Sequence, residues 1–327
     1  MQPDAIHLSR RDALIKLLRA AGAGAGAAGL GLWLSERSWR PETMLAVSAK
    51  HGHTIAAAPQ LPEMAVITGD DPAQLARQAV EELGGIRRFI ARGDVVLVKP
   101  NIGWDRTPEQ AATTNPDVVA EIIRQCLNAG AKRVIVTDVS CNDPRRCFQR
   151  SGIAEAAQRV GAEVLLPDPA RFKEVDLQGE ILRAWPVLDL FLNVDKIINI
   201  PIAKHHSLTG TTLGMKNWYG MLGGPRHQLH QKIHESLVDL ADFVRPTLTI
   251  IDCYRILVRN GPTGGNLQDV LLKKTLVAGT DPVALDAYVA KAYWNLEVSA
   301  LPYLRMAANR GLGTYEFEKV RTRIKTL

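Results

Sequence analysis

The chain has 327 residues, 46% of them hydrophobic, with 40 basic and 34 acidic residues and a formal net charge of +6. The first 50 residues hold seven of the basic and four of the acidic residues, so they account for half of that net charge. The small excess on the remaining body does not favour a nucleic-acid partner, and the sequence has no RNP-like aromatic motif and no zinc-finger spacing. That body is long enough for one large or two modest domains with a real core.

The chain begins with the features of a twin-arginine export signal. Arg10 and Arg11 precede an uncharged run over residues 20–34 that is rich in Ala and Gly. An export receptor recognises such a segment as a targeting signal. The apolar run is shorter than the roughly 20 residues that span a bilayer. We predict a leader over residues 1–49, a periplasmic or other extracytoplasmic location, and membrane contact only through an uncleaved leader. A small-residue cleavage site near Val47–Ala49 is one option and retention of the leader is the other.

A linker and an α/β body follow the leader. Residues 50–62 hold three consecutive alanines, Pro59 and Pro62, which predicts the linker. The body is predicted over residues 63–327, with two candidate lobes at 63–190 and 191–327.

Short apolar strands alternate with amphipathic helices in the first half of the body. The predicted strands cover residues 95–98, 134–136 and 163–166, and the predicted helices run from Asn115-Pro116 to Gly130 and from Ile153 to Val160. This Rossmann-like alternation indicates an α/β fold with a mostly parallel sheet and helices on both faces.

The second half of the body alternates less regularly. Strands are predicted at 196–200, 247–251 and 276–278, and a helix at 282–294 begins with Asp281 as its N-cap and Pro282 in its first turn. A polar segment with several histidines lies between the first two of these strands, over residues 203–231.

Polar residues follow the predicted strands directly. Ligands of open α/β sheets bind beyond the carboxyl ends of the strands, so these residues are candidates for a shared site. They are Lys99-Pro100-Asn101, Asp138, Lys204-His205-His206, Asp252 and Asp281. The alternative is that each of them only caps a helix or solvates a loop.

Basic residues and histidines are concentrated between residues 204 and 234. Lys204, Lys216 and Arg226 predict an anionic small-molecule ligand, because neighbouring cations are tolerated when a negative group neutralises them. His205 is a candidate general acid and base near neutral pH. We assign catalytic roles to Lys204, His205 and Lys216, and substrate-binding roles to Lys99, Asn101, Asn217, Arg226, Asn260 and Asp281.

A divalent-metal site is a second possibility in this region. His230 and His234 are four residues apart, which places them on one face if the segment 228–243 is helical. Asp252 would complete the ligand set. The alternative is that one histidine packs or caps while the other faces water.

Four cysteines are present, at positions 126, 141, 147 and 253, and none forms a C-x-x-C pair. We therefore expect no intrinsic iron–sulfur cluster. Cys126 and Cys253 fall in a predicted helix and strand and are expected in the core. The spacing of Cys141 and Cys147 permits a disulfide without requiring one.

Several motifs together resemble the domain-of-unknown-function family 362. They are Lys99-Pro100-Asn101, Thr114-Asn115-Pro116, Asn199 to Ser207, Gly214-Met215-Lys216-Asn217, Asn260 to Gly265 and Ala278 to Val283. The resemblance covers residues 95–294 and implies the fold and the motif positions. The positions that match the family pattern are Lys99, Asn101, Lys204, His205, Lys216, Asn217, His230, His234 and Asp281.

The resemblance also implies a redox association, since some members of that family carry a ferredoxin-like module. This chain lacks the cysteine ligands of such a module, so we expect a separate iron–sulfur protein as partner. Two functions follow from the sequence. The first is an exported, redox-associated enzyme that acts on an anionic small molecule, with or without a metal. The second is a non-catalytic protein that binds a metal or cofactor, or assists assembly, for an exported iron–sulfur redox complex.

Overall fold

The structure, a computed structural model, describes residues 52–327, and the predicted leader with its twin arginines lies outside them. Residues 52–58 form neither helix nor strand, although His53 is buried against the body and Thr247 donates its hydroxyl proton to the carbonyl oxygen of His53. Within the described residues, no helix has the length and apolar character that a membrane span requires.

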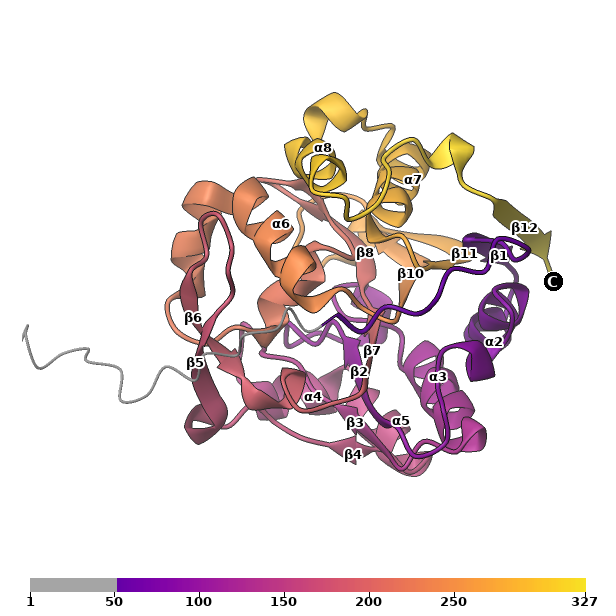
Figure 1. Ribbon diagram of the computed structural model, residues 1–327, viewed down its shortest axis with the longest axis horizontal. Coiled ribbons are helices and arrows are strands. Elements are labelled where there is room, and N and C mark those ends of the chain that lie inside the picture. The colour runs from indigo at the N-terminus through magenta and orange to yellow at the C-terminus, as the bar shows by residue number, and fades with distance from the viewer. Residues whose placement is uncertain (1–51) are drawn as a thin grey trace, which may run out of the picture. The chain divides into compact units, whose positions relative to one another are not determined.

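A mostly parallel sheet forms the centre of the described chain (Figure 1). Its strands follow the order β12-β1-β11-β10-β7-β2-β3-β4, and β8 pairs with β10 and carries β9. The neighbours from β10 through β4 are parallel, whereas β11 runs antiparallel to both β1 and β10. The strands of this sheet are β1 Met64–Thr68, β2 Val95–Pro100, β3 Arg133–Val136, β4 Glu163–Val164, β7 Lys196–Ile200, β8 Ile202–His206, β9 Gly210–Thr212, β10 Leu248–Leu257, β11 Val270–Gly279 and β12 Thr322–Thr326. A separate antiparallel hairpin is formed by β5 Phe172–Asp176 and β6 Ala184–Leu188.

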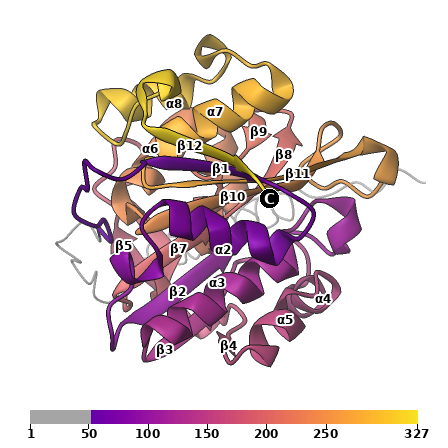
Figure 2. The same ribbon diagram turned by 90° about the vertical axis from the view of Figure 1, so that its right-hand side faces the viewer.

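Helices cover both faces of the sheet, as Figure 2 shows. One face carries α2 Pro72–Glu82, α3 Pro116–Ala129, α4 Pro144–Arg150 and α5 Ile153–Arg159. The other face carries α6 Ile233–Val244, α7 Pro282–Trp294 and α8 Pro302–Asn309. The predicted α/β class with a mostly parallel sheet is therefore confirmed.

This sandwich explains the apolar runs in the sequence. Val96, Leu97 and Val98 of β2 are all fully buried, because alternate side chains of the strand enter the two helical layers. The layers and the sheet join the two predicted lobes: β1, from 63–190, pairs with β11, from 191–327.

Local capping signals set the helix ends that the sequence predicted. The Asn115 side chain caps α3 by accepting a hydrogen bond from the Asp117 amide, and the helix ends at Gly130, whose φ of 98° is left-handed. Asp281 caps α7 by accepting from the Val283 and Ala284 amides. Both helices begin with a proline, whose missing amide hydrogen is not needed in the first turn.

The polar segment of the second half forms short elements for which the sequence analysis made no prediction. They are the strands β8 and β9, and then two 3-10 helices, η5 Lys216–Met221 and η6 Arg226–Lys232. A helix over 228–243 was the condition for a shared histidine face, but α6 begins only at Ile233, because Lys232 has non-helical backbone angles, φ −130° and ψ 52°. This irregular segment returns over the carboxyl ends of the parallel strands.

Candidate functional site

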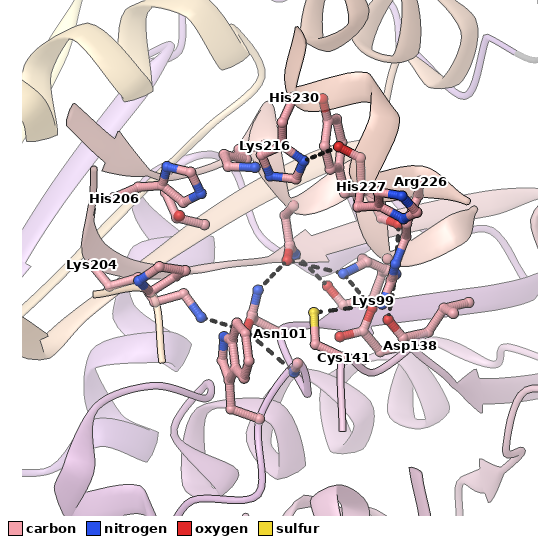
Figure 3. Close-up of a pocket in the computed structure, with 18 of the residues that line it drawn as sticks. Lys99, Asn101, Asp138, Cys141, Lys204, His206, Lys216, Arg226, His227 and His230 are labelled. Carbon is pink, nitrogen blue, oxygen red and sulfur yellow. Dashed lines mark hydrogen bonds and ion pairs between the residues drawn. The ribbon is translucent and has the colours of Figure 1, made fainter. Parts of the chain in front are cut away.

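A pocket of about 450 Å³ lies at the carboxyl ends of β2, β3 and β8, under η5 and η6 (Figure 3). Its polar lining includes Lys99, Asn101, Asp138, Cys141, Lys204, His206, Lys216, Asn217, Tyr219, Arg226, His227 and His230. These residues come from segments more than one hundred positions apart, which the parallel strands deliver to one edge of the sheet.

The floor of the pocket is a buried ion pair. The Lys99 ammonium is fully buried and lies 2.8 Å from Asp138 Oδ1, while Asp138 Oδ2 accepts a hydrogen bond from the Ile102 amide. Burial lowers the pKa of Lys99, and the Asp138 carboxylate opposes that shift. Gly220 lies directly over this pair, and a Cβ at that position would stand 1.8 Å from Asp138 Oδ1. The floor therefore has matched charges and requires a glycine above it.

A chain of amides orients the floor. Asn217 Oδ1 accepts hydrogen bonds from Lys99 Nζ and from Asn101 Nδ2, each at 2.9 Å. Asn217 Nδ2 donates in turn to Asn199 Oδ1 at 2.8 Å. These bonds fix the Asn101 amide so that its oxygen accepts from Lys204. The two predicted substrate-binding asparagines thus hold lysines in place.

Lys204 has acceptors but no carboxylate partner. Its side chain is 1% exposed, and Nζ donates to Asn101 Oδ1 at 2.9 Å and to Ala112 O at 2.7 Å. Burial, opposed by Cys141 and Asp138 and aided by the neighbouring ammonium groups of Lys99 and Lys216, lowers the pKa of Lys204 to about 7. The amine is therefore poised between its charged and neutral forms near neutral pH.

Lys216 is almost as deeply buried and has fewer partners. It is 8% exposed, and its ammonium lies 4.1 Å from the ring centroid of Tyr219 without a hydrogen bond or ion pair to any residue of 52–327. Burial lowers the pKa of Lys216 to about 8, and the nearby Arg226 acts in the same direction.

Arg226 adds a third cation to the same pocket. Its guanidinium donates to the carbonyl oxygens of Val139, Tyr219 and Ser140 at 2.6 to 3.0 Å. No carboxylate neutralises it within the described chain, since its remaining polar contact is the Cys141 sulfur at 3.5 Å. Carbonyl oxygens thus fix the orientation of the group and leave its positive charge unmatched.

Of the three histidines that line the pocket, His206 and His230 have opposite tautomers. His206 Nδ1 lies 3.2 and 3.4 Å from the amides of Leu208 and Thr209, so it accepts and the neutral ring carries its proton on Nε2. His230 Nδ1 lies 3.1 Å from the carbonyl oxygen of His227, so it donates and its Nε2 has a free lone pair. Their ring centroids are 5.9 Å apart and nearly parallel.

Both rings stay neutral at physiological pH. Burial lowers the pKa of His206 to about 3, helped by the charge of Lys216, and burial also lowers the pKa of His230. The pocket therefore offers one imidazole that donates a hydrogen bond and one that accepts a proton.

The predicted general acid and base, His205, does not line this pocket. Side chains alternate along a strand, so Lys204 and His206 of β8 share one face and His205 takes the other. His205 Nδ1 instead accepts a hydrogen bond from the Gly261 amide at 3.3 Å. His206 occupies the place that the sequence analysis gave to His205.

The structure separates the three predicted metal ligands. His230 lines the pocket, whereas His234 stacks on Tyr303 at a centroid distance of 6.2 Å. The two histidines do not share a helical face, because η6 and α6 meet between them at Lys232. Asp252 is buried in β10, where it accepts hydrogen bonds from the amides of Asn115 and Tyr254. Among residues 52–327, no group of three or more His, Cys, Asp and Glu side chains is placed to hold a metal ion.

Asp281 and Asn260 also lie outside the pocket. Asp281 follows β11, which is antiparallel to β10, so its position is the opposite edge of the sheet. It caps α7 there and accepts a further hydrogen bond from the Thr314 amide. Asn260 donates to Asp269 Oδ2 at 2.9 Å within its own loop. Pro262 of the same glycine-rich loop does reach the pocket lining.

The sequence analysis missed the lining residues Tyr219, Gly220 and Cys141, and it named His206 as a candidate for a shared site without giving it a role. The alternation of β8 could have indicated His206, but no local signal marks the other three. Cys141 is exposed, whereas Cys147 is buried in α4. Both thiols are free, so the two cysteines form no disulfide.

Comparison with protein families gives a match over residues 96–291 to a domain of unknown function, family 362. The chain belongs to this family. The matched region contains the whole of the site described above, from Lys99 to His230.

Among curated proteins, this family 362 chain is similar to a thylakoid-associated protein of Synechocystis sp., with 28% identity over 252 residues. That alignment covers 72% of this chain and 74% of the relative.

Two solved structures are similar in part. One is a protein from Thermotoga maritima, with 12% identity and a TM-score of 0.40, covering 73% of this chain and 60% of the other. The second is the lactate racemase apoprotein from Thermoanaerobacterium thermosaccharolyticum, with 11% identity and a TM-score of 0.40, covering 71% of this chain and 55% of the other. This chain thus spans less than two thirds of the length of either structure.

Proposed function

We propose that the protein is an enzyme that binds a small molecule bearing a carboxylate or phosphate group in this pocket and moves a proton on it. The observation that carries the proposal is the set of three cations, Lys204, Lys216 and Arg226, that line one cavity without a carboxylate partner. Among residues 52–327, Asp138 is the one carboxylate in the lining of this pocket, and Lys99 neutralises it.

Electrostatics favour an anion in such a cavity. A unit charge 4 Å from one cation gains about 4 kcal/mol at the effective dielectric constant of a protein surface. Arg226 offers a fixed guanidinium, and Lys204 is held by Asn101, so little conformational freedom is lost when the anion binds.

The two imidazoles and Lys216 supply the proton chemistry. His230 Nε2 can accept a proton, His206 Nε2–H can donate a hydrogen bond to a developing negative oxygen, and the pKa of Lys216, lowered by burial to about 8, suits proton exchange near neutral pH.

The test begins with isothermal titration of the full chain with inorganic phosphate. We expect one phosphate per chain, with affinity reduced at least tenfold in Lys216→Met, since one of three cations is lost. Lys232→Met is the matched control, because this lysine lies in η6 with its side chain 63% exposed and outside the lining of the pocket. Equal affinities in all three proteins would contradict the proposed site.

Catalysis is tested separately, by NMR, through deuterium incorporation from D2O into a panel of small carboxylic acids. Incorporation that disappears in Lys216→Met supports the enzyme. A ligand retained in stoichiometric amount by the purified protein, together with no incorporation in any acid, would instead support the non-catalytic binding protein.

We further propose export by the twin-arginine route and work beside a separate iron–sulfur protein. The support is the Arg10–Arg11 pair and the uncharged run that follows it. The double variant Arg10→Lys, Arg11→Lys should remain in the cytoplasmic fraction while the native chain is exported. An iron–sulfur absorbance spectrum in material that co-purifies with the exported chain supports the partner, and its absence contradicts it.

A further inference from the structure

Lys216 stands apart from the other lysines of the pocket. Lys99 Nζ contacts Asp138 and two oxygen acceptors, and Lys204 Nζ has two acceptors, whereas Lys216 Nζ has none within residues 52–327. Lys216 is nevertheless more than nine-tenths buried and lines the cavity (Figure 3). Its ammonium lies 4.1 Å from the ring centroid of Tyr219.

Burial lowers the pKa of Lys216 to about 8, so most of this amine is charged near pH 7 and a fraction is neutral. Arg226 brings further positive charge to the same cavity and acts in the same direction, while Cys141 acts against it. A neutral lysine amine carries a lone pair and is a nucleophile toward carbonyl carbon.

The groups required for reversible addition to a carbonyl surround this amine. His230, with its free Nε2 lone pair, and His206, with its Nε2–H, both lie close enough to Lys216 for its charge to lower their pKa values, a smaller effect than that of burial. The positive charge of Arg226 can attract a carboxylate in the same cavity, with Nε–H as the donor, because its Nη1 and Nη2 hydrogens already bond to carbonyl oxygens and to Cys141.

We propose that Lys216 Nζ forms an imine with the carbonyl carbon of a 2-oxo acid whose carboxylate is held by Arg226. The N–C bond forms as the carbonyl π electron pair moves to oxygen, which His206 Nε2–H stabilises. The two protons of the neutral amine pass in turn through His230 Nε2 to that oxygen: the first gives the hydroxyl group, and the second lets it leave as water while the nitrogen lone pair forms the C=N bond. Amine and oxo acid thus give imine and water, with no oxidant or reductant. The inference rests on the proposed function and names its substrate class.

Reductive trapping tests this directly. The full chain is incubated with pyruvate and sodium cyanoborohydride, and the product is examined by intact-mass and peptide mass spectrometry. We expect a single carboxyethyl adduct per chain, mapped to Lys216, at reductant concentrations where other lysines are unmodified. Acetone, which has the carbonyl but no carboxylate, should give no selective adduct.

Two variants serve as controls. Lys216→Arg keeps the positive charge but cannot form an imine, so the selective adduct should fall to background while the thermal unfolding midpoint confirms folding. Lys232→Arg should label as the native chain does. A selective adduct on Lys204, or the same adduct pattern in Lys216→Arg, would overturn the inference.

Titration with pyruvate and with phosphate, without reductant, tests the anion pocket separately from the imine at Lys216. Binding of both anions at one site with no adduct at Lys216 would overturn the imine and leave the anion pocket standing. The absence of any binding, together with the absence of an adduct, would overturn both.

Discussion

The floor and the wall of the pocket show two different uses of buried charge. On the floor, Lys99 meets Asp138 at 2.8 Å and shares its remaining protons with Asn217 and a carbonyl oxygen. On the wall, Lys216 and Arg226 have no carboxylate partner among the described residues. A matched pair satisfies the fold, whereas unmatched cations leave an interaction for a ligand. The comparison therefore separates residues that hold the site from residues that use it.

The largest expected effect comes from breaking the floor. Gly220→Ala would place a methyl group 1.8 Å from Asp138 Oδ1 and 2.6 Å from Lys99 Nζ, and neither group can leave without exposing a buried charge. We expect a loss of about 3 kcal/mol or more in the free energy of unfolding, measured by urea denaturation. Gly224→Ala is the comparison, since its Cβ would meet nothing closer than 3.5 Å, although its φ of 61° adds backbone strain. A loss no larger than that of Gly224→Ala would contradict the floor's structural role.

A smaller change in the free energy of unfolding, of opposite sign, is expected when Lys216 on the wall of the pocket is replaced. Lys216→Met removes a buried amine that has no acceptor, so the free energy of unfolding at pH 7 should rise by on the order of 1 kcal/mol while phosphate affinity falls. Urea denaturation and titration of the same protein measure the two changes. A variant that is both less stable and unimpaired in binding would reverse the comparison.

The same substitution has a defined pH dependence. Burial lowers the pKa of Lys216 to about 8 from its ordinary 10.5, so the unfolded chain holds more protons between those two pH values. The free energy of unfolding of the native chain therefore rises with pH in this range. The extra stability of Lys216→Met over the native chain should shrink from pH 8 to pH 10.5. Denaturation curves at pH 7 and pH 10 check this, and an advantage that widens toward pH 10 would contradict the assigned direction.

The two faces of β8 give the smallest contrast. His206→Asn keeps an acceptor for the Leu208 and Thr209 amides but removes Nε2–H from the pocket, so we expect several-fold weaker trapping of pyruvate. His205→Asn changes the opposite face and should leave trapping within a factor of about two, as is usual for residues outside a site. Equal losses in both variants would show that the alternation of β8 does not decide which histidine acts.

The regular half of the fold could be predicted because its signals are local. An apolar run gave β2, and Asn115-Pro116 with Gly130 gave the ends of α3. In the second half, β7, β10, β11 and α7 were predicted near their observed positions, but the direction of strand pairing was not, because it depends on long-range contacts. The antiparallel direction of β11 carries Asp281 away from the pocket, and no short segment encodes that direction.

The sequence predicted which residue types make up the candidate site, but not which side chains point into the pocket. Lys204, Lys216 and Arg226 were recognised as cations near one another, and the structure places all three in one lining. The pocket-facing position of His206 could have been inferred from that of Lys204, because residues two apart in a strand share one face. Asp138 followed a predicted strand, yet its pairing with Lys99 depends on the register of β2 and β3, which the sequence does not display.

Proton uptake on anion binding tests most directly whether the buried lysines of the pocket wall await a negative ligand. A bound anion raises the pKa values of Lys204 and Lys216, which burial lowers to about 7 and about 8 in the empty pocket. Titration of the full chain with phosphate at pH 8.5, in two buffers of different ionisation enthalpy, should therefore show net proton uptake in the native chain, less uptake in Lys216→Met, and native uptake in Lys232→Met. Phosphate binding with no proton uptake, or with uptake unchanged by Lys216→Met, would contradict the account.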